Sequence, residues 1–322
     1  MTDFTVVIPT YNGEHRLPGI LQCLRSQVCP PDFSWEIIVV DNNSADRTAQ
    51  LIAKYQTSEE SQFPCPLRYA FEPRQGAGFA RQLGIEEAHS EFIGFLDDDN
   101  LPDEDWVTAA YLFAQSHPQA GAIASRIWGD FAVPPAPELK PLLPFLALTN
   151  RGDQPLRYDP RKPLLPPSAG LVVRRSAWQG NVPSHLVLNG RTPGSMVTGE
   201  DLEVLAHLQR SGWEIWYNPA MKLRHTIAAA RLQAEYLLPF FNGIGLSRYA
   251  TRMAGLPTWQ RGYMTIAYAI NDLRKIVLHQ WNYRGKVRSN LVAACQWELL
   301  KSSFISPLYL WQQGYLKRFS QE

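Results

Sequence analysis

The sequence is poor in cysteine and in long apolar runs. The four cysteines among 322 residues are not spaced as in zinc or redox motifs: Cys23, Cys29, Cys65 and Cys295. They therefore exclude a thiolate metal centre and a dense disulfide framework. No stretch reaches the roughly 18 uninterrupted apolar residues of a membrane helix. The first residues also lack the basic flank and apolar run of a signal peptide, so we expect a cytoplasmic protein.

The chain also has almost no net charge. Thirty-one basic and 30 acidic residues give +1, so the charge implies no nucleic acid partner. The distribution is uneven, because 12 basic and four acidic residues follow position 225, a balance of +8 that leaves about −7 in the first 225 residues. This asymmetry predicts two parts with different roles.

The first 125 residues alternate between short β-branched runs and amphipathic segments. The predicted strands are Phe4–Pro9, Trp35–Val40, Leu67–Phe71 and Phe92–Leu96, and the predicted helices are His15–Gln27, Asp46–Tyr55 and Gly78–Ala88. This alternation predicts an α/β fold with a mostly parallel central sheet and helices on both faces. Ligands bind beyond the carboxyl ends of such strands, so the polar residues that follow three of them should meet at one edge.

The rest of the chain is less regular. Ten of the 25 prolines lie in residues 129–168, which predicts a long surface excursion of the kind that forms lids or specificity loops. Further predictions are strands at Ala169–Arg174, Ile215–Asn218 and Met221–Leu223, a helix at Asp201–Arg210, and helices from Leu232 that are broken at Pro239, Pro257 and Pro307. We divide the chain into a catalytic domain, 1–230, with halves 1–125 and 126–230, and a basic aromatic helical tail, 231–322.

Three adjacent carboxylates, Asp97, Asp98 and Asp99, follow a predicted buried strand. Such groups repel one another unless a cation joins them, and oxygen ligands suit Mg²⁺ or Mn²⁺. The alternative is a solvated acidic turn before the next helix. The upstream strand and the other polar strand ends favour the metal.

Two further segments predict nucleotide contacts. Asp41, Asn42 and Asn43 follow the second strand, where polar side chains can bond a base or ribose, although a turn and helix cap at Ser44 or Asp46 explain part of this pattern. Gly76 and Arg81 open a helix and suit phosphate binding. The pattern Gly-x-Gly with an acid about twenty residues later resembles a dinucleotide fingerprint, but Arg81 occupies the third glycine position, and we reject a dehydrogenase.

A second acidic group, Glu200, Asp201 and Glu203, opens the helix that follows the proline-rich segment. The helix dipole favours such acids structurally, but a carboxylate held beside a cation is also a natural general base. We assign that role to Asp201. His225 is either a structural histidine or a ligand in a mixed oxygen and nitrogen site.

Seven motifs together resemble the family 2 glycosyltransferases, which have the GT-A fold. They are VVIPTYNGE, IIVVDNNSADRT, RQGAGFARQLGIEEA, FIGFLDDDN, SAGLVVRRSAW, GEDLEVLAHLQRSGW and NPAMKLRH, and the resemblance covers roughly residues 4 to 226. The resemblance implies an enzyme that takes a sugar from a nucleoside-diphosphate sugar, often UDP-linked, and inverts its anomeric centre in one displacement. Bacterial relatives of this size build exopolysaccharide or other cell-surface glycans, which implies a glycan or lipid-linked acceptor.

The resemblance also assigns roles to residues. Pro9, Thr10, Tyr11 and Asn12 line the nucleotide pocket, with Asp41 on the base and Asn43 beside it. Gly76, Arg81, Asp97 and Asp98 contribute to the donor site, while Asp97, Asp99 and His225 hold Mn²⁺ or Mg²⁺. Asp201 is the base, with Glu200 beside it.

Two other functions compete with this interpretation. A sugar-nucleotide pyrophosphorylase needs a glycine-rich basic loop after the first strand, which Pro9-Thr10-Tyr11-Asn12-Gly13 does not supply. A catalytically silent nucleotide- or glycan-binding protein that keeps the GT-A fold is the second alternative. The sequence does not fix an oligomeric state, and a homo-oligomer is compatible with it.

The tail has two interpretations. The first is a helical appendage that packs on the core. The second is a peripheral contact with the inner face of the plasma membrane, because Trp259, Trp281, Trp297 and Trp311 accompany the basic excess.

Overall fold

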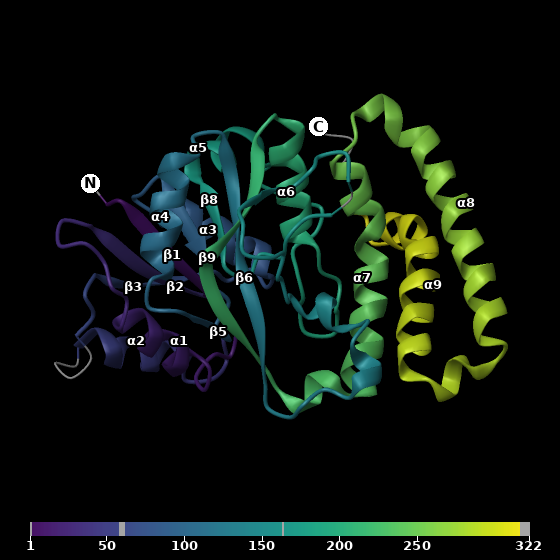
Figure 1. Ribbon diagram of the computed structural model, residues 1–322, viewed down its shortest axis with the longest axis horizontal. Coiled ribbons are helices and arrows are strands. Elements are labelled where there is room, and N and C mark those ends of the chain that lie inside the picture. The colour runs from purple at the N-terminus through teal and green to yellow at the C-terminus, as the bar shows by residue number, and fades with distance from the viewer. Residues whose placement is uncertain (1, 58–61, 163, 316–322) are drawn as a thin grey trace.

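The computed structural model describes residues 2–57, 62–162 and 164–315. Its centre is a mixed sheet of nine strands in the order β3-β2-β1-β4-β8-β6-β9-β5, with β7 paired to β9. Helices cover both faces of this sheet, and three long helices form a further layer at one side of the molecule (Figure 1). The predicted α/β class with a helical C-terminal part is confirmed.

The first half of the sheet is parallel, as predicted. Its strands are β1 (Phe4–Thr10), β2 (Trp35–Asp41), β3 (Leu67–Phe71) and β4 (Phe92–Phe95). The helices that connect and follow them are α1 (Leu17–Arg25), α2 (Thr48–Thr57), α3 (Ala77–Glu87) and α4 (Trp106–Ser116). Each boundary lies within two residues of its prediction, where a prediction was made, because strong periodicity fixes these elements.

Side chains of each strand alternate between two cores, as the pleat requires. Val6 and Ile8 of β1 pack with α1, α2 and α4 on one face, whereas Val7 packs with α3 on the other. The second face is completed by α5 (Arg175–Asn181) and α6 (Glu200–Arg210). Helix α5 was not predicted; it is short and directly continues β8.

The second half of the sheet mixes directions. Its strands are β5 (Asn100–Pro102), β6 (Ala120–Phe131), β7 (Leu156–Arg157), β8 (Leu171–Arg174) and β9 (Glu214–Ile227). β8 runs antiparallel to both β4 and β6, and β6 runs parallel to β9. The carboxyl ends of β1, β2, β4, β6 and β9 therefore lie at one edge, together with the beginning of β8.

Two predicted short strands are one strand in the structure. β9 continues through Pro219 because the pairing with β6 shifts register there, so that Asn218 faces Ser125 and Lys222 faces Arg126. A proline cannot donate to a ladder, and such an irregularity is where a strand tolerates it. The separation of Ile215–Asn218 from Met221–Leu223 was wrong.

The proline-rich segment is only partly a surface excursion. It begins inside β6, contains the short 3-10 helices η2 (Pro137–Leu139) and η3 (Leu143–Leu146), and includes β7. Leu139, Leu142 and Leu146 are buried in a cluster with the C-terminal helices. This anchoring corrects the expectation of a segment that runs wholly over the surface.

The described part of the tail and the turn before it contain η4 (Ala229–Leu232), α7 (Ala234–Ala254), α8 (Thr258–Tyr283), η5 (Lys286–Ser289) and α9 (Leu291–Gln312). Only Pro257 separates helices; Pro239 and Pro307 lie inside α7 and α9, so the predicted breaks there were wrong. Each costs one intrahelical hydrogen bond, which the packing of the two helices offsets. Among the described residues, no helix is both long and apolar enough to cross a membrane.

Candidate active site

Hydrogen bonds join the loops that follow the strands at this edge. The Asn12 amide nitrogen donates to Ser44 Oγ at 2.8 Å, and the Ala45 nitrogen donates to Asn12 Oδ1 at 2.8 Å. Thr10 Oγ1 donates to Asp98 Oδ2 at 2.6 Å. The loops after β1, β2 and β4 therefore form one surface, as the strand directions predicted.

The loop after β3 is attached to the same surface by Asn42. Its side chain accepts from the Gly76 nitrogen at 2.7 Å and donates to the Arg74 carbonyl at 2.6 Å. Gly76 has a φ of +137°, and a Cβ there would lie 2.4 Å from the Asn189 carbonyl oxygen. Only glycine allows that approach. Asn42 belongs to the polar segment that was predicted after the second strand, whereas the role of Asn189 was not predicted.

The predicted nucleotide residues differ in exposure. Tyr11 is 38% exposed and Asn43 is exposed in a left-handed conformation, so both can reach a ligand. Asp41 is buried, accepts from the Ser44 nitrogen at 2.9 Å and accepts from the Tyr69 hydroxyl at 2.8 Å. Pro9 lies within β1 with its side chain buried.

Each aspartate of the triplet has its own arginine. Asp97 accepts a hydrogen bond from Arg81 at 3.0 Å. Asp98 accepts two from Arg16, at 2.7 and 2.9 Å. Asp99 accepts one from Arg231 at 3.0 Å. Because Asp98 also accepts from Thr10 and is buried, it braces the loop. Arg16 and Arg231 carry no sequence signal that separates them from other basic residues.

Two of the three predicted metal ligands, Asp99 and His225, have a spacing that suits a bound cation. Asp99 Oδ2 and His225 Nε2 are 3.3 Å apart, close to the spacing of about 3 Å between adjacent ligands of an octahedral Mg²⁺. One Arg231 NH group lies 3.0 Å from the first atom and 2.9 Å from the second. The guanidinium therefore fills the position between them, and Asp97 is turned to Arg81.

The electrostatics of Asp99 follow from these neighbours. Burial alone would raise the pKa of the carboxyl, but His225 and Arg231 outweigh it and lower the pKa to about 2. Within the described ranges, no three His, Cys, Asp or Glu side chains gather so that they could hold a metal ion. A cation at Asp99 and His225 thus requires Arg231 to move.

The first turn of α6 connects to this edge through Arg81. The buried guanidinium donates to Glu200 Oε1 at 2.8 Å and to Asp97 Oδ1 at 3.0 Å. Burial alone lowers the pKa of Arg81, but Asp97 and Glu200 outweigh it, so the net shift is upward and the group stays charged. One arginine therefore ties the predicted base region to the predicted donor region.

Asp201, the next residue of α6, accepts hydrogen bonds from backbone nitrogens. Its Oδ2 accepts from the Ser168 backbone nitrogen at 3.0 Å. Burial, then repulsion from Glu200, raises the pKa of this carboxyl to about 6. A carboxylate with a pKa nearer neutrality is a stronger base, which is the property that proton abstraction needs.

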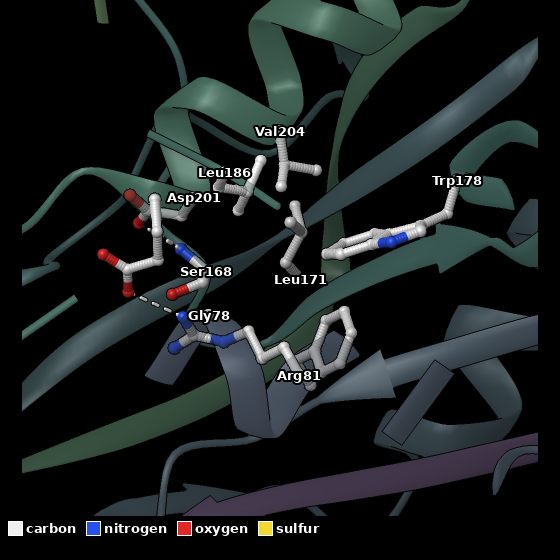
Figure 2. Close-up of a pocket in the computed structure, with 10 residues that line it drawn as sticks. Gly78, Arg81, Ser168, Leu171, Trp178, Leu186, Asp201 and Val204 are labelled. Carbon is white, nitrogen blue, oxygen red and sulfur yellow. Dashed lines mark hydrogen bonds and ion pairs between the residues drawn. The ribbon is translucent and has the colours of Figure 1, made fainter. Parts of the chain in front are cut away.

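Asp201 also borders a small cavity. Figure 2 shows Asp201, Ser168 and Arg81 at one end, and Trp178, Leu171 and Val204 at the other. The space of about 10 Å³ is comparable to a single water. It is too small for a sugar.

Comparison with known proteins adds to this geometry. The sequence profile described as "Glycosyl transferase family 2" matches residues 5–166, half of the chain. The chain belongs to glycosyl transferase family 2. The match begins in β1 and includes Asp97, Asp98 and Asp99.

Curated relatives of this family 2 chain match about a third of its length. The poly(ribitol-phosphate) beta-N-acetylglucosaminyltransferase TarS of Staphylococcus aureus (strain Mu50) is 29% identical over 117 residues, 36% of this chain and 20% of that protein. Glycosyltransferase AglE of Haloferax volcanii is 32% identical over 104 residues, 32% of each chain. The matched segment thus spans a fifth to a third of these relatives.

Solved structures extend the likeness over nearly the whole family 2 chain. S. aureus TarS 1–349 in complex with UDP-GlcNAc has a TM-score of 0.52 at 15% identity, covering 97% of this chain and 92% of that one. Mannosyltransferase PcManGT from Pyrobaculum calidifontis, in complex with GDP-Man and Mn²⁺, has a TM-score of 0.58 at 15% identity, covering 99% and 88%. At such identities the likeness establishes the GT-A fold.

Proposed function

We propose that this chain transfers a sugar from a nucleoside-diphosphate sugar, UDP-linked, to a hydroxyl of a glycan or lipid-linked acceptor, with inversion. Its family relatives are glycosyltransferases, and its structural neighbours were solved with UDP-GlcNAc or GDP-Man. The observation that carries the proposal is the Arg81 bridge from Asp97 to Glu200, because it ties the first turn of α6, which also contains Asp201, to the loop after β4.

The donor lies across the joined loops. Tyr11 and Asn43 meet the base, and Asn12 fixes the distance between the loops after β1 and β2. Asp41 stabilises the turn after β2, which lies beside the base, by accepting the hydrogen bond from the Ser44 nitrogen. The donor diphosphate then lies near Asp97, Asp99 and His225.

Residues of the chain perform the displacement. Asp201 removes the proton of the acceptor hydroxyl, whose oxygen attacks the anomeric carbon from the face opposite the diphosphate. The new carbon–oxygen bond forms as the bond to the diphosphate oxygen breaks, and the configuration inverts. Arg81 stays cationic and holds Glu200 and Asp97 in place.

A divalent cation, Mn²⁺ or Mg²⁺, would be held by Asp99 and His225 with Asp97 nearby. When bound, it would neutralise charge on the departing nucleoside diphosphate. Arg231 then becomes free to pair with another anion at the same edge, such as the diphosphate.

The test is thermal stabilisation by UDP, GDP, CDP, dTDP and NAD, each with and without Mn²⁺. We expect stabilisation by UDP that depends on Mn²⁺, because both ligands bind the folded chain. A shift with GDP and not UDP corrects the base. A shift with NAD alone revives a dehydrogenase, and no shift with any nucleotide contradicts the proposal.

A measurement of turnover distinguishes an enzyme from a catalytically silent binding protein. Release of UDP from a UDP-sugar in the presence of acceptor glycans indicates an enzyme. Nucleotide binding without turnover of any sugar or acceptor favours the silent protein, in which the three arginine-paired aspartates serve only the fold.

A further inference from the structure

A helix that packs on a core normally buries its apolar face and exposes its polar face, whereas α8 does the opposite. Its two buried side chains are both polar, Asp272 and His279. Asp272 accepts from Arg252 of α7 at 2.6 and 2.9 Å, and Thr265 lies 3.2 Å from the Tyr249 hydroxyl. Polar groups therefore attach α8 to the rest of the molecule.

The opposite face of α8 is apolar and exposed. Its large side chains recur every three or four residues, which places them along one face. They are Trp259, Tyr263, Ile266, Ile270, Leu273, Val277 and Trp281, and Leu278 is exposed beside them. Trp259 is 74% exposed and Trp281 is 70% exposed, so the two ends of the face carry indole rings.

The neighbouring end of α9 is also apolar. Phe304, Ile305, Leu308 and Trp311 are between 41% and 66% exposed. In Figure 1, α8 lies at the margin of the molecule, outside α7 and α9. Scattered exposed apolar residues are ordinary, but a dozen large ones on two packed helices are more than a scatter, and such a concentration marks an interaction site.

The charges beside this face have one sign. The only acid in α8 is Asp272, which is buried and paired with Arg252. Arg274 and Lys275 are exposed beside the apolar face, and Arg284 follows its end. An apolar face with basic residues beside it is complementary, in both polarity and charge, to an apolar surface that carries negative charge.

A second copy of the chain fits this face poorly. Pairing α8 with α8 of another copy about its centre would bring Arg274 and Lys275 of both helices near the dyad. No exposed carboxylate of α8 offsets them, whereas paired helices normally place opposite charges beside their seam.

We propose that the outer face of α8, with the exposed end of α9, docks on the surface of an anionic lipid bilayer. The helix lies in the interfacial plane: its apolar side chains enter the headgroup boundary, the two indole rings anchor its ends, and Arg274 and Lys275 meet anionic headgroups. With 26 residues, α8 presents about 39 Å of face. The proposal stands apart from the donor chemistry, since it uses no residue of the active site.

Vesicle flotation of the full chain tests this surface. The probes are phosphatidylcholine vesicles with and without phosphatidylglycerol, at low and high salt. We expect flotation with the anionic vesicles, weakened by salt. The double variant Ile270→Ser and Trp281→Ser should partition at least about tenfold more weakly, because each side chain gives up burial in the interface. The variant Arg274→Gln with Lys275→Gln should lose the salt dependence.

The matched control is Leu112→Ser, which removes a leucine that is 56% exposed on α4. It should float like the unmodified chain, and all variants should keep the thermal unfolding temperature because these side chains are exposed. Negligible flotation with both vesicles overturns the proposal, as does equal loss in the Leu112 variant. A stable dimer that the Ile270 and Trp281 substitutions dissociate, without vesicle binding, also overturns it and assigns the face to a second copy.

Discussion

The catalytic role proposed for Asp201 would come with a cost to folding. Its pKa is higher in the folded chain, about 6, than its ordinary value of 3.8. The folded chain therefore binds the proton more tightly than the unfolded chain. The stability that this group contributes is fully present below about pH 4 and is lost as the pH rises through 6. At neutral pH the buried carboxylate works against folding.

Asp201→Asn should therefore abolish sugar transfer and stabilise the fold. We expect about 1–3 kcal/mol greater stability at pH 7, since two pKa units correspond to about 2.7 kcal/mol, and no gain below pH 4. Urea unfolding at both pH values measures this, with Asp105→Asn at an exposed position as control. Unchanged transfer by the Asp201→Asn variant removes Asp201 from the mechanism. A loss of stability at pH 7 contradicts the charge argument.

The same pKa sets the pH dependence of activity. Transfer should decline below about pH 6, where Asp201 is protonated, provided that proton removal limits the rate.

Arg231 occupies the position between Asp99 and His225, and so competes with any cation there. Arg231→Ala should tighten Mn²⁺ binding in the absence of nucleotide by about tenfold, equivalent to about 1.4 kcal/mol. Calorimetric titration of Mn²⁺ measures this without substrate turnover. Arg224→Ala, at an exposed residue of β9, is the control. If Mn²⁺ binding is unchanged or weaker in the Arg231→Ala variant, Arg231 is not a competitor.

At the scale of elements, α7 and α9 show how close packing overrides sequence signals. A Cβ at Gly245 of α7 would lie 2.5 Å from Ser302 Cβ and 2.7 Å from the Leu299 oxygen of α9. Ser306 Oγ also donates to the Leu246 carbonyl and accepts from the Tyr249 nitrogen at 3.0 Å. Small residues let the two backbones meet here, much as in other close helix pairs.

Gly245→Ala should destabilise the chain by about 1–3 kcal/mol, because the new methyl group meets backbone and a Cβ atom. Gly262→Ala is its matched control. Gly262 lies in α8 with nothing within 4 Å of an added Cβ, so alanine there should stabilise by about 0.5–1 kcal/mol through helix propensity. Urea denaturation gives both values. Equal effects of the two substitutions would exclude close packing as the cause.

The strong elements could be predicted because their signal is local. Strands β1, β2 and β4 are continuous apolar runs that end in polar residues, and their shared edge follows from the direction of the chain alone. The joining of Thr10 to Asp98 and of Asn12 to Ser44 bears out this convergence.

The predictions that failed did so because contacts between distant parts of the chain overrode the local sequence pattern. Pro219 interrupts the apolar pattern but not β9, because a register shift against β6 receives it. Pro239 and Pro307 remain inside helices because α7 and α9 pack on each other. Arg16 and Arg231 are ordinary basic residues in the sequence, and only the fold brings them to Asp98 and Asp99.

At the scale of the molecule, the division at residue 230 stays a prediction. One cluster combines Leu142 and Leu146 of the proline-rich segment, Ile227 at the end of β9, and Phe241 of α7. The segments that flank the active-site edge therefore share a core with the helical layer. This arrangement explains how a segment with ten prolines is held in place without long helices of its own.

The shared core predicts that the sheet and the helical layer unfold together. Phe241 is fully buried, with the Phe145 ring 4.8 Å away across the predicted boundary. Phe241→Ala should cost about 3–5 kcal/mol and should shift a single calorimetric transition to lower temperature. Phe304→Ala, at a residue 42% exposed on α9, should change stability by less than about 1 kcal/mol. Two transitions, of which the Phe241 substitution moves only one, would instead show that the tail folds as a separate unit beside the sheet.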